Sequence, residues 1–194
     1  MQGFMDRQDK QYFEDFLNLS PNDEVFVDVG GFDGCSTLEF IKHCPGYKSV
    51  HFFEPEESNM LIAKDKLRAF RSINYHDIAL SDKKETVRFS INGSASSIDD
   101  TGEIIINTEK LDEVIQDAAT YIKMDIEGAE AKALAGAKQT IIEYRPRLAI
   151  CVYHKGDDMW KIPQQVLSYY EDYSMYLRHY TEGVTETVMF FIPK

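Results

Sequence analysis

Acidic side chains gather in one short stretch of the sequence, KMDIEGAE, where Asp125, Glu127 and Glu130 lie close together. Carboxylates this close repel one another, so their grouping indicates contact with a substrate or cofactor rather than a contribution to stability. Lys123 is expected on the same face of a strand as Asp125, where it would neutralise the acids or bind an anionic substrate. Glu130 has a structural alternative, because an acid in the first turn of a helix interacts favourably with the helix dipole.

A histidine, His154, directly follows an apolar strand expected at 148–153. An unperturbed imidazole has a pKa of about 6.5, which suits proton transfer at cellular pH. We therefore group His154 with Lys123, Asp125 and Glu127 as candidate catalytic residues, although a lone histidine is often only a structural hydrogen-bonding residue. Histidine and acids could also hold a divalent cation, but no ligand spacing in the sequence decides for or against a metal site.

The candidate ligand-binding residues begin in a glycine-rich turn, VFVDVGGFDG. The apolar run predicts a buried parallel strand, and the glycines after it predict a turn at which backbone approaches something closely. Ligands of open α/β sheets bind outside the carboxyl ends of the strands, so a ligand site is favoured here over a plain tight turn. The residues concerned are Asp28, Gly30, Gly31, Asp33, Gly34 and Ser36.

A second acid, Glu54, ends the apolar stretch SVHFFEP. Glu54 follows Asp28 by about one βαβ repeat. At that position a nucleotide-binding fold places the carboxylate that binds the hydroxyls of a ribose. We therefore add Glu54 and its neighbour Pro55 to the candidate ligand-binding residues.

The elements that must position these residues alternate between strand and helix, which predicts an α/β fold with a mostly parallel sheet. Strands are expected near 25–29, 49–54, 73–80, 121–128 and 148–153, and helices near 7–19, 36–43, 56–70, 110–118, 130–141 and 159–170. Two β-like runs, 86–91 and 103–108, flank a loop containing Ser94, Ser96 and Ser97, which would either lie over the site or form a solvated turn. The closing runs at 173–181 and 185–193 predict an antiparallel hairpin at one sheet edge.

Length and composition predict a single domain, 1–194, with an N-terminal helical segment (1–22) and a core (24–194). The formal net charge of −12 argues against binding of nucleic acid or an anionic membrane surface. Three cysteines without metal-ligand spacing favour a reducing, cytoplasmic location. No segment approaches the roughly 18 consecutive apolar residues of a membrane span.

Several motifs of the sequence together resemble those of a known protein family: VFVDVGGFDG, FFEPEESN, DIALSD, the serine-rich loop and, most specifically, IKMDIEGAE. With these motifs the chain, from about Glu24 to Pro193, resembles the FkbM family of S-adenosylmethionine-dependent methyltransferases. The resemblance implies a Rossmann-like class I methyltransferase fold, with a mostly parallel sheet, an antiparallel C-terminal hairpin strand and helices on both faces. It also implies S-adenosyl-L-methionine as cofactor and a hydroxyl of a sugar, nucleotide sugar, glycan or similar small metabolite as acceptor.

The resemblance gives each candidate residue an expected role. Asp28 and Asp33 would meet the ammonium group of the cofactor directly or through water, and Glu54 would accept both ribose hydroxyls. Asp77 would accept a hydrogen bond from the adenine amine, with Ile78 and Ala79 beside the ring. Asp125 would contact cofactor or substrate, and His154, Asp125 or Glu127 would be the general base.

Two other functions use the same fold. A nicotinamide-dependent reductase is disfavoured because the turn lacks G-x-G-x-x-G and no tyrosine–lysine pair at helical spacing is present. A non-catalytic module that binds S-adenosylmethionine would not need the acidic cluster. The sequence leaves open the acceptor and the oligomeric state, although the aromatic C-terminal hairpin could form an interface.

Overall fold

The computed structural model describes residues 10–92, 96–98 and 101–194 of the chain. Its elements follow one another as η2 (Asp15–Leu17), β1 (Val25–Val29), α1 (Cys35–His43), β2 (Ser49–Phe53), α2 (Glu57–Leu67), β3 (Ile73–His76), β4 (Ala79–Leu80), β5 (Glu85–Ser90), β6 (Ser97–Ile98), β7 (Ile104–Glu109), α3 (Leu111–Val114), β8 (Tyr121–Met124), α4 (Glu130–Gly136), α5 (Lys138–Tyr144), β9 (Arg147–Cys151), α6 (Asp158–Tyr169), β10 (Tyr173–His179) and β11 (Thr187–Pro193).

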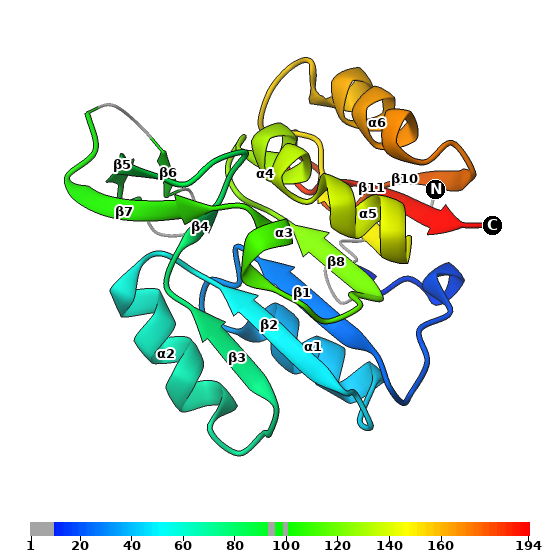
Figure 1. Cartoon of the computed structure of the whole chain (residues 1–194), viewed down its shortest axis with the longest axis horizontal. Coiled ribbons are helices and arrows are strands. Elements are labelled where there is room, and N and C mark those ends of the chain that lie inside the picture. Colours follow the sequence, from blue (N-terminus) through cyan, green and yellow to red (C-terminus); the bar gives the residue numbers. More distant parts are fainter. Residues whose placement is uncertain (1–9, 93–95, 99–100) are drawn as a thin grey trace.

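The main sheet has the strand order β10-β11-β9-β8-β1-β2-β3. Strands β1, β2, β3, β8 and β9 pair in parallel, whereas β11 pairs antiparallel with both β9 and β10. The chain runs from β1 outward to β3 and then resumes beside β1 with β8, so the strand order reverses between β1 and β8 (Figure 1). Open α/β sheets bind ligands in the crevice at such a point, beyond the carboxyl ends of the strands. The predicted α/β class, mostly parallel sheet and C-terminal hairpin are confirmed.

Helices cover both faces of this sheet, which is why its central strands are apolar on both sides. Every residue of β1, β2 and β8 is buried. One face packs on α1 and α2, through contacts of Phe26 and Phe52 with side chains such as Phe40 and Leu67. The other face packs on α3 to α6, where side chains of β1 and β8 meet those of Leu134 and others. The sheet is thereby held rigidly enough to position the residues at its edge.

A small second sheet, with the order β4-β7-β5-β6, lies to one side of the main sheet (Figure 1). The predicted strand at 73–80 is therefore divided: β3 ends at His76 in the main sheet, and Ala79 and Leu80 pair with β7 in the second sheet. The β-like runs near 86–91 and 103–108 form the antiparallel pair of β5 and β7. Ser94 lies outside the described residues.

The predicted helix at 7–19 is wrong from Lys10 onward, where the described residues form the 3₁₀ turn η2, a 3₁₀ position at Lys10 and irregular backbone; residues 7–9 lie outside the described part. The backbone has positive φ at Tyr12 (69°) and Asn18 (46°), which is incompatible with a continuous right-handed helix. The apolar side chains of Tyr12, Phe13 and Leu17 are nevertheless buried against the α1 side of the sheet. Their spacing indicated burial correctly but not the helix.

The predicted helix at 130–141 is divided into α4 and α5 at Ala137. A Cβ on Gly136 would lie 2.0 Å from the carbonyl oxygen of Ser81, so the chains approach closely at this break. The Asp112 carboxylate accepts the backbone N–H groups of Gln139 and Thr140, both at 2.9 Å, at the start of α5. Asp112 belongs to α3, which ends at Val114 and is shorter than the predicted helix at 110–118.

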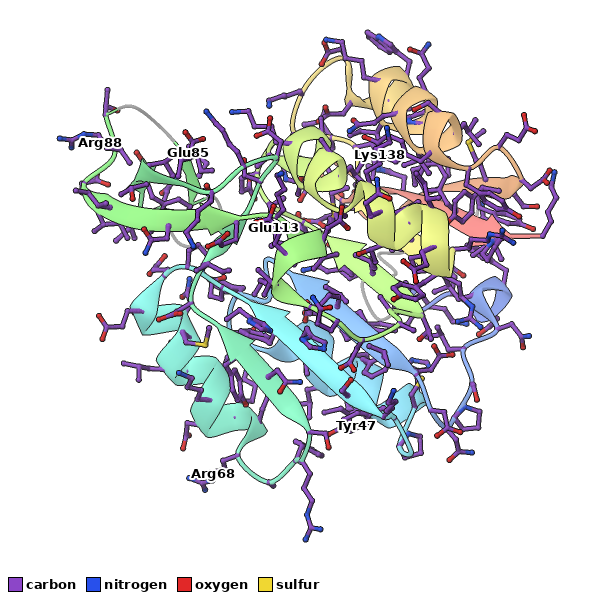
Figure 2. The ribbon with its side chains drawn as sticks, viewed as in Figure 1. Tyr47, Arg68, Glu85, Arg88, Glu113 and Lys138 are labelled. Carbon is purple, nitrogen blue, oxygen red and sulfur yellow. The ribbon has the colours of Figure 1, made fainter. Side chains whose placement is uncertain are left out.

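Charged side chains on the outside of the fold point away from the sheets. Figure 2 shows Arg68 beyond the end of α2 and Arg88 on the second sheet, at different edges of the molecule. Arg68 pairs with Asp65 at 2.8 Å, and the Arg88 guanidinium donates to the carbonyl oxygen of Gly102 at 3.1 Å. Among the described residues, no helix combines the length and apolarity that crossing a membrane requires.

Candidate active site

A cavity of about 360 Å³ opens at the carboxyl ends of β1, β2 and β8. Its wall comes from the turn after β1, the ends of β2 and β8, the second sheet, the segment before η2 and the loop before β11. The lining residues are Gln11, Tyr12, Val29, Gly30, Gly31, Phe32, Asp33, Cys35, Ser36, Phe53, Glu54, Pro55, Asn59, Ile78, Ala79, Leu80, Phe89, Ser96, Ile98, Lys123, Asp125, Ile126, Glu127, Ala129 and Glu186.

The turn after β1 requires glycine because other backbone lies against it. Gly30 has a φ of +74°, and a Cβ there would lie 2.0 Å from the carbonyl oxygen of Asp125. A Cβ on Gly31 would lie 2.1 Å from the Phe52 ring. Both glycine N–H groups donate to the carbonyl oxygen of Phe53, at 3.1 and 3.0 Å. The turn is therefore fixed between the ends of β2 and β8, with its other edge facing the cavity.

Asp28 is completely buried and does not line the cavity, so its position does not favour the predicted contact with a ligand. One carboxylate oxygen accepts hydrogen bonds from the hydroxyls of Ser36 (2.6 Å) and Thr37 (2.7 Å), and the other pairs with Lys123 Nζ at 3.2 Å. Lys123 Nζ also donates to the carbonyl oxygen of Gly30 at 2.6 Å. Asp28 thus holds the start of α1 and Lys123, and Lys123 holds the turn.

Lys123 lies in the cavity wall, almost completely buried, and remains a cation. Burial by itself would lower the pKa of Lys123, but Asp28 and Asp125 outweigh it and raise the pKa above its ordinary value. The ammonium also lies 5.2 Å from the centre of the Tyr12 ring, a cation–π contact. With these contacts Lys123 supports the site more readily than it would bind an anionic substrate.

Glu54 lines the cavity from the end of β2, as its place in the sequence predicts. Oε2 accepts the backbone N–H of Phe32 at 3.0 Å and Oε1 accepts that of Glu56 at 2.9 Å. Burial, which outweighs these hydrogen bonds, and the nearby charge of Glu56 raise the pKa of Glu54 from 4.5 to about 7. Each oxygen keeps a lone pair for a further donor, such as a hydroxyl group.

The apolar part of the cavity lies between the main and second sheets. Ile78, Ala79 and Leu80 form one part of its wall and Phe89 of β5 another. Asp77 is exposed and is not among the lining residues, so its predicted contact with a ligand is not supported by its position. A flat apolar group such as an aromatic ring fits this chemistry.

The other candidate ligand-binding residues of the turn divide into two groups. Asp33, Ser36 and Pro55 line the cavity. Asp33 pairs with Lys66 at 2.6 Å, and this pairing outweighs burial and lowers the pKa of Asp33. Gly34 has a φ of +84° at the start of α1 and packs against α2, outside the lining.

Acidic side chains occupy the opposite end of the cavity. Asp125 and Glu127 line it from the end of β8, and Glu186 does so from the loop before β11. Asp125 accepts a hydrogen bond from the Tyr12 hydroxyl at 2.7 Å. Glu127 has a φ of +52°, an uncommon conformation for a residue other than glycine. The predicted group of acids is thus in place, and one further acid joins it.

His154 lies behind these acids and does not line the cavity. Its Nδ1 is 2.8 Å from Glu130 Oε1, and its Nε2 is 3.5 Å from Asp125 Oδ1 and 3.4 Å from Glu127 Oε2. Burial lowers the pKa of His154, but the nearby carboxylates of Glu127, Glu130 and Asp125 outweigh it and raise the pKa to about 10. A ring that is already protonated at neutral pH is poorly suited to the predicted role of general base.

Sequence reasoning missed part of the wall. Gln11 and Tyr12 reach the site from an irregular segment, Asn59 from α2, and Phe89 from the second sheet. Gln11, Tyr12 and Phe89 lie outside the motifs, and only the fold brings them to the cavity, whereas Asn59 ends the motif FFEPEESN, which could have singled it out. Ser96, from the serine-containing loop, does line the cavity, and its hydroxyl lies 3.2 Å from Glu56 Oε2.

Known structures share this fold. A structure described as methyltransferase FkbM from Methylobacillus flagellatus KT is 29% identical, with a TM-score of 0.81; the match covers 94% of this chain but 47% of that one, so this chain spans about half its length. An rRNA methylase from Streptococcus thermophilus is 15% identical (TM-score 0.61, 93% of each chain). The Streptococcus mutans protein SMU.1697c in complex with SAH is also 15% identical (TM-score 0.57, 96% of this chain and 99% of that one).

The last two similarities concern the fold alone, which is that of the class I methyltransferases. The search of curated proteins found no match. The family described as "Methyltransferase FkbM domain" matches residues 28–181, which include β1, the glycine turn, Glu54 and the acidic cluster. The chain therefore belongs to the FkbM methyltransferase family.

Proposed function

We propose that this protein transfers a methyl group from S-adenosyl-L-methionine to a hydroxyl group of a small acceptor such as a sugar, nucleotide sugar or glycan end. The observation that carries the proposal is one cavity with two chemically different ends. Glu54, beside the glycine turn, occupies one end, and Asp125 and Glu127 occupy the other. A nucleoside bound at the first end would direct its reactive group toward the second.

The cofactor would lie across the ends of β1 and β2. Glu54 would accept the ribose hydroxyls with the lone pairs that its backbone donors leave available. The adenine would lie among Ile78, Ala79 and Phe89, and the amino-acid part would pass along the turn at Gly30 and Gly31. This cofactor has no pyrophosphate, which suits a turn without the G-x-G-x-x-G pattern.

Methyl transfer to a hydroxyl needs alignment and removal of one proton. The acceptor oxygen forms a bond to the methyl carbon, the carbon–sulfur bond breaks with its electron pair going to sulfur, and the hydroxyl proton passes to a base. We assign the base to Glu127, because it lines the cavity, whereas Asp125 already accepts the Tyr12 hydroxyl and His154 lies behind the acids.

Calorimetric titration with S-adenosylmethionine and, separately, with NAD tests the cofactor. We expect S-adenosylmethionine to bind, and Glu54→Gln to weaken binding by at least about tenfold, since a charge-assisted hydrogen bond contributes about 1.5–3 kcal/mol. Asp117→Asn, a carboxylate substitution outside the cavity lining, is the matched control. Binding of NAD without binding of S-adenosylmethionine would instead support a reductase.

Methyl transfer to a panel of sugars, nucleotide sugars and glycans tests the reaction. We expect Glu127→Gln to lower kcat by about 10²–10⁴-fold, the contribution of a general base, with cofactor affinity within about twofold of wild type. Cofactor binding without transfer to any hydroxyl compound would favour a non-catalytic module or another acceptor class. Equal kcat for Glu127→Gln and wild type would remove Glu127 as the base.

A further inference from the structure

The acids at the inner end of the cavity form a cluster with His154 whose geometry suits a cation. One possible donor atom from each of Asp125, Glu130 and His154 lies within 4.8 Å of the others. Donors on opposite sides of a divalent cation are about 4–4.4 Å apart, because each bond is about 2.0–2.2 Å long. Shifts of a few tenths of an ångström would therefore bring the three donors into coordination range.

Two buried atoms in this cluster have no hydrogen-bond partner in the described structure: Glu130 Oε2 and His154 Nε2. The side chain of Glu130 is 1% exposed and that of His154 is 6% exposed. Leaving such polar atoms unsatisfied costs about 1–3 kcal/mol each. His154 Nε2 faces Asp125 Oδ1 at 3.5 Å and Glu127 Oε2 at 3.4 Å, and neither contact has the geometry of a hydrogen bond.

The histidine ring is oriented as metal-binding histidines usually are. His154 Nδ1 lies 2.8 Å from Glu130 Oε1, so a proton on Nδ1 would be held by that carboxylate. When a cation replaces that proton, the remaining proton of the ring is on Nε2, which faces the carboxylates of Asp125 and Glu127. Glu130 Oε1 also accepts the N–H of Ile126 at 3.0 Å, which fixes the carboxylate relative to the end of β8.

From this geometry we infer that Asp125, Glu130 and His154 bind a divalent cation of the kind that accepts mixed nitrogen and oxygen ligands, such as Mn²⁺. A cation there gives Glu130 Oε2 a partner, leaves the Nε2–H of His154 to donate to the carboxylates beside it, and neutralises the acids. Asp125 also lines the cavity, so a cation bound to it would lie beside the cavity. The role in catalysis rests on the proposed function: a bound acceptor hydroxyl would have a lowered pKa and lose its proton to Glu127.

The test measures binding of Mn²⁺ itself, without cofactor or acceptor. Wild-type protein stripped with a chelator and dialysed is titrated with Mn²⁺, and free Mn²⁺ is followed by electron paramagnetic resonance. We expect one site per chain, with affinity reduced at least tenfold in Asp125→Asn, Glu130→Gln and His154→Gln. Asp117→Asn removes a carboxylate that also pairs with a histidine, His51, but lies elsewhere; it should bind Mn²⁺ like wild type.

Thermal unfolding with and without Mn²⁺ serves as a second readout in case a buried substitution disturbs folding. Mn²⁺ should raise the Tm of wild type and Asp117→Asn but not that of folded Glu130→Gln. Absence of Mn²⁺ binding to wild type up to millimolar concentrations, or equal affinity in all variants, would overturn the inference and leave His154 as a cation held by carboxylates. S-adenosylmethionine binding measured on the same samples separates the two proposals, because either ligand can bind when the other does not.

Discussion

Glu54 gives the clearest quantitative prediction, because its burial links stability to pH. Burial raises the pKa of Glu54 from 4.5 to about 7, so the folded protein holds a proton that the unfolded chain releases. The folded state therefore loses stability as the pH rises from about 4.5 to about 7. Since a tenfold change in an ionisation constant corresponds to about 1.4 kcal/mol, the full loss is about 3 kcal/mol above pH 7.

The experiment compares wild type with Glu54→Gln, which cannot ionise at this position. Free energies of unfolding from urea titrations at pH 5 and pH 8 give the pH dependence of each protein. From pH 5 to pH 8 the free energy of unfolding of wild type should fall by about 2.5 kcal/mol relative to that of Glu54→Gln. This is less than the full loss because part of it has already occurred at pH 5. Other titrating groups are shared by both proteins and cancel.

Free energies of unfolding of wild type and Glu54→Gln that run parallel with pH, within about 0.5 kcal/mol, would refute a raised pKa of Glu54. The proposed cofactor adds a further arm to the experiment. Donors from a ribose favour the ionised carboxylate, so saturating S-adenosylmethionine should reduce the loss in wild type at pH 8. The stabilisation expected at 100 times Kd is about 2.7 kcal/mol. Glu54→Gln, with its weakened binding, should gain much less at the same cofactor concentration.

Three further substitutions test the supports of the cavity. Gly30→Ala should lower the free energy of unfolding by at least about 2 kcal/mol, because its Cβ would lie 2.0 Å from the carbonyl oxygen of Asp125 at a φ of +74°; an unchanged Tm would contradict this. Lys123→Met should cost about 3–5 kcal/mol in urea unfolding by leaving the Asp28 carboxylate buried and unpaired, and adding Asp28→Asn should recover part of the loss. Tyr12→Phe removes the 2.7 Å hydrogen bond to Asp125 and should cost about 1.5–3 kcal/mol; a loss confined to the binding of ligands would contradict a structural role.

The sheet could be predicted from the sequence because its strands carry their own signal. β1, β2 and β8 are buried on both faces and therefore appear as continuous apolar runs. The segment before η2 could not be predicted, since its apolar spacing fits a helix while its backbone has positive φ at Tyr12 and Asn18. Ala79 and Leu80 follow β3 in the sequence without any break signal, and only their pairing with β7 places them in another sheet.

Site residues were predictable where one strand end determines their position. Glu54 and Asp125 directly follow strands, Glu127 is the third residue after β8, and all three line the cavity. Asp28 has the same kind of signal but lies one residue before the end of its strand, where the side chain turns inward to Ser36, Thr37 and Lys123. Side chains alternate in direction along a strand, so the position of Asp28 within β1 makes it a buried support and not a residue of the cavity wall.

The two ends of the cavity are mechanically connected through the glycine turn. The carbonyl oxygen of Gly30 accepts Lys123 Nζ, and the Cα of Gly30 lies against the backbone of Asp125. Movement of the turn when a ligand binds beside Glu54 must therefore displace the end of β8, because close-packed backbone leaves no space between them. Ligand binding beside Glu54 and the position of the acids after β8 are therefore coupled. Gly30→Ala should disturb both together.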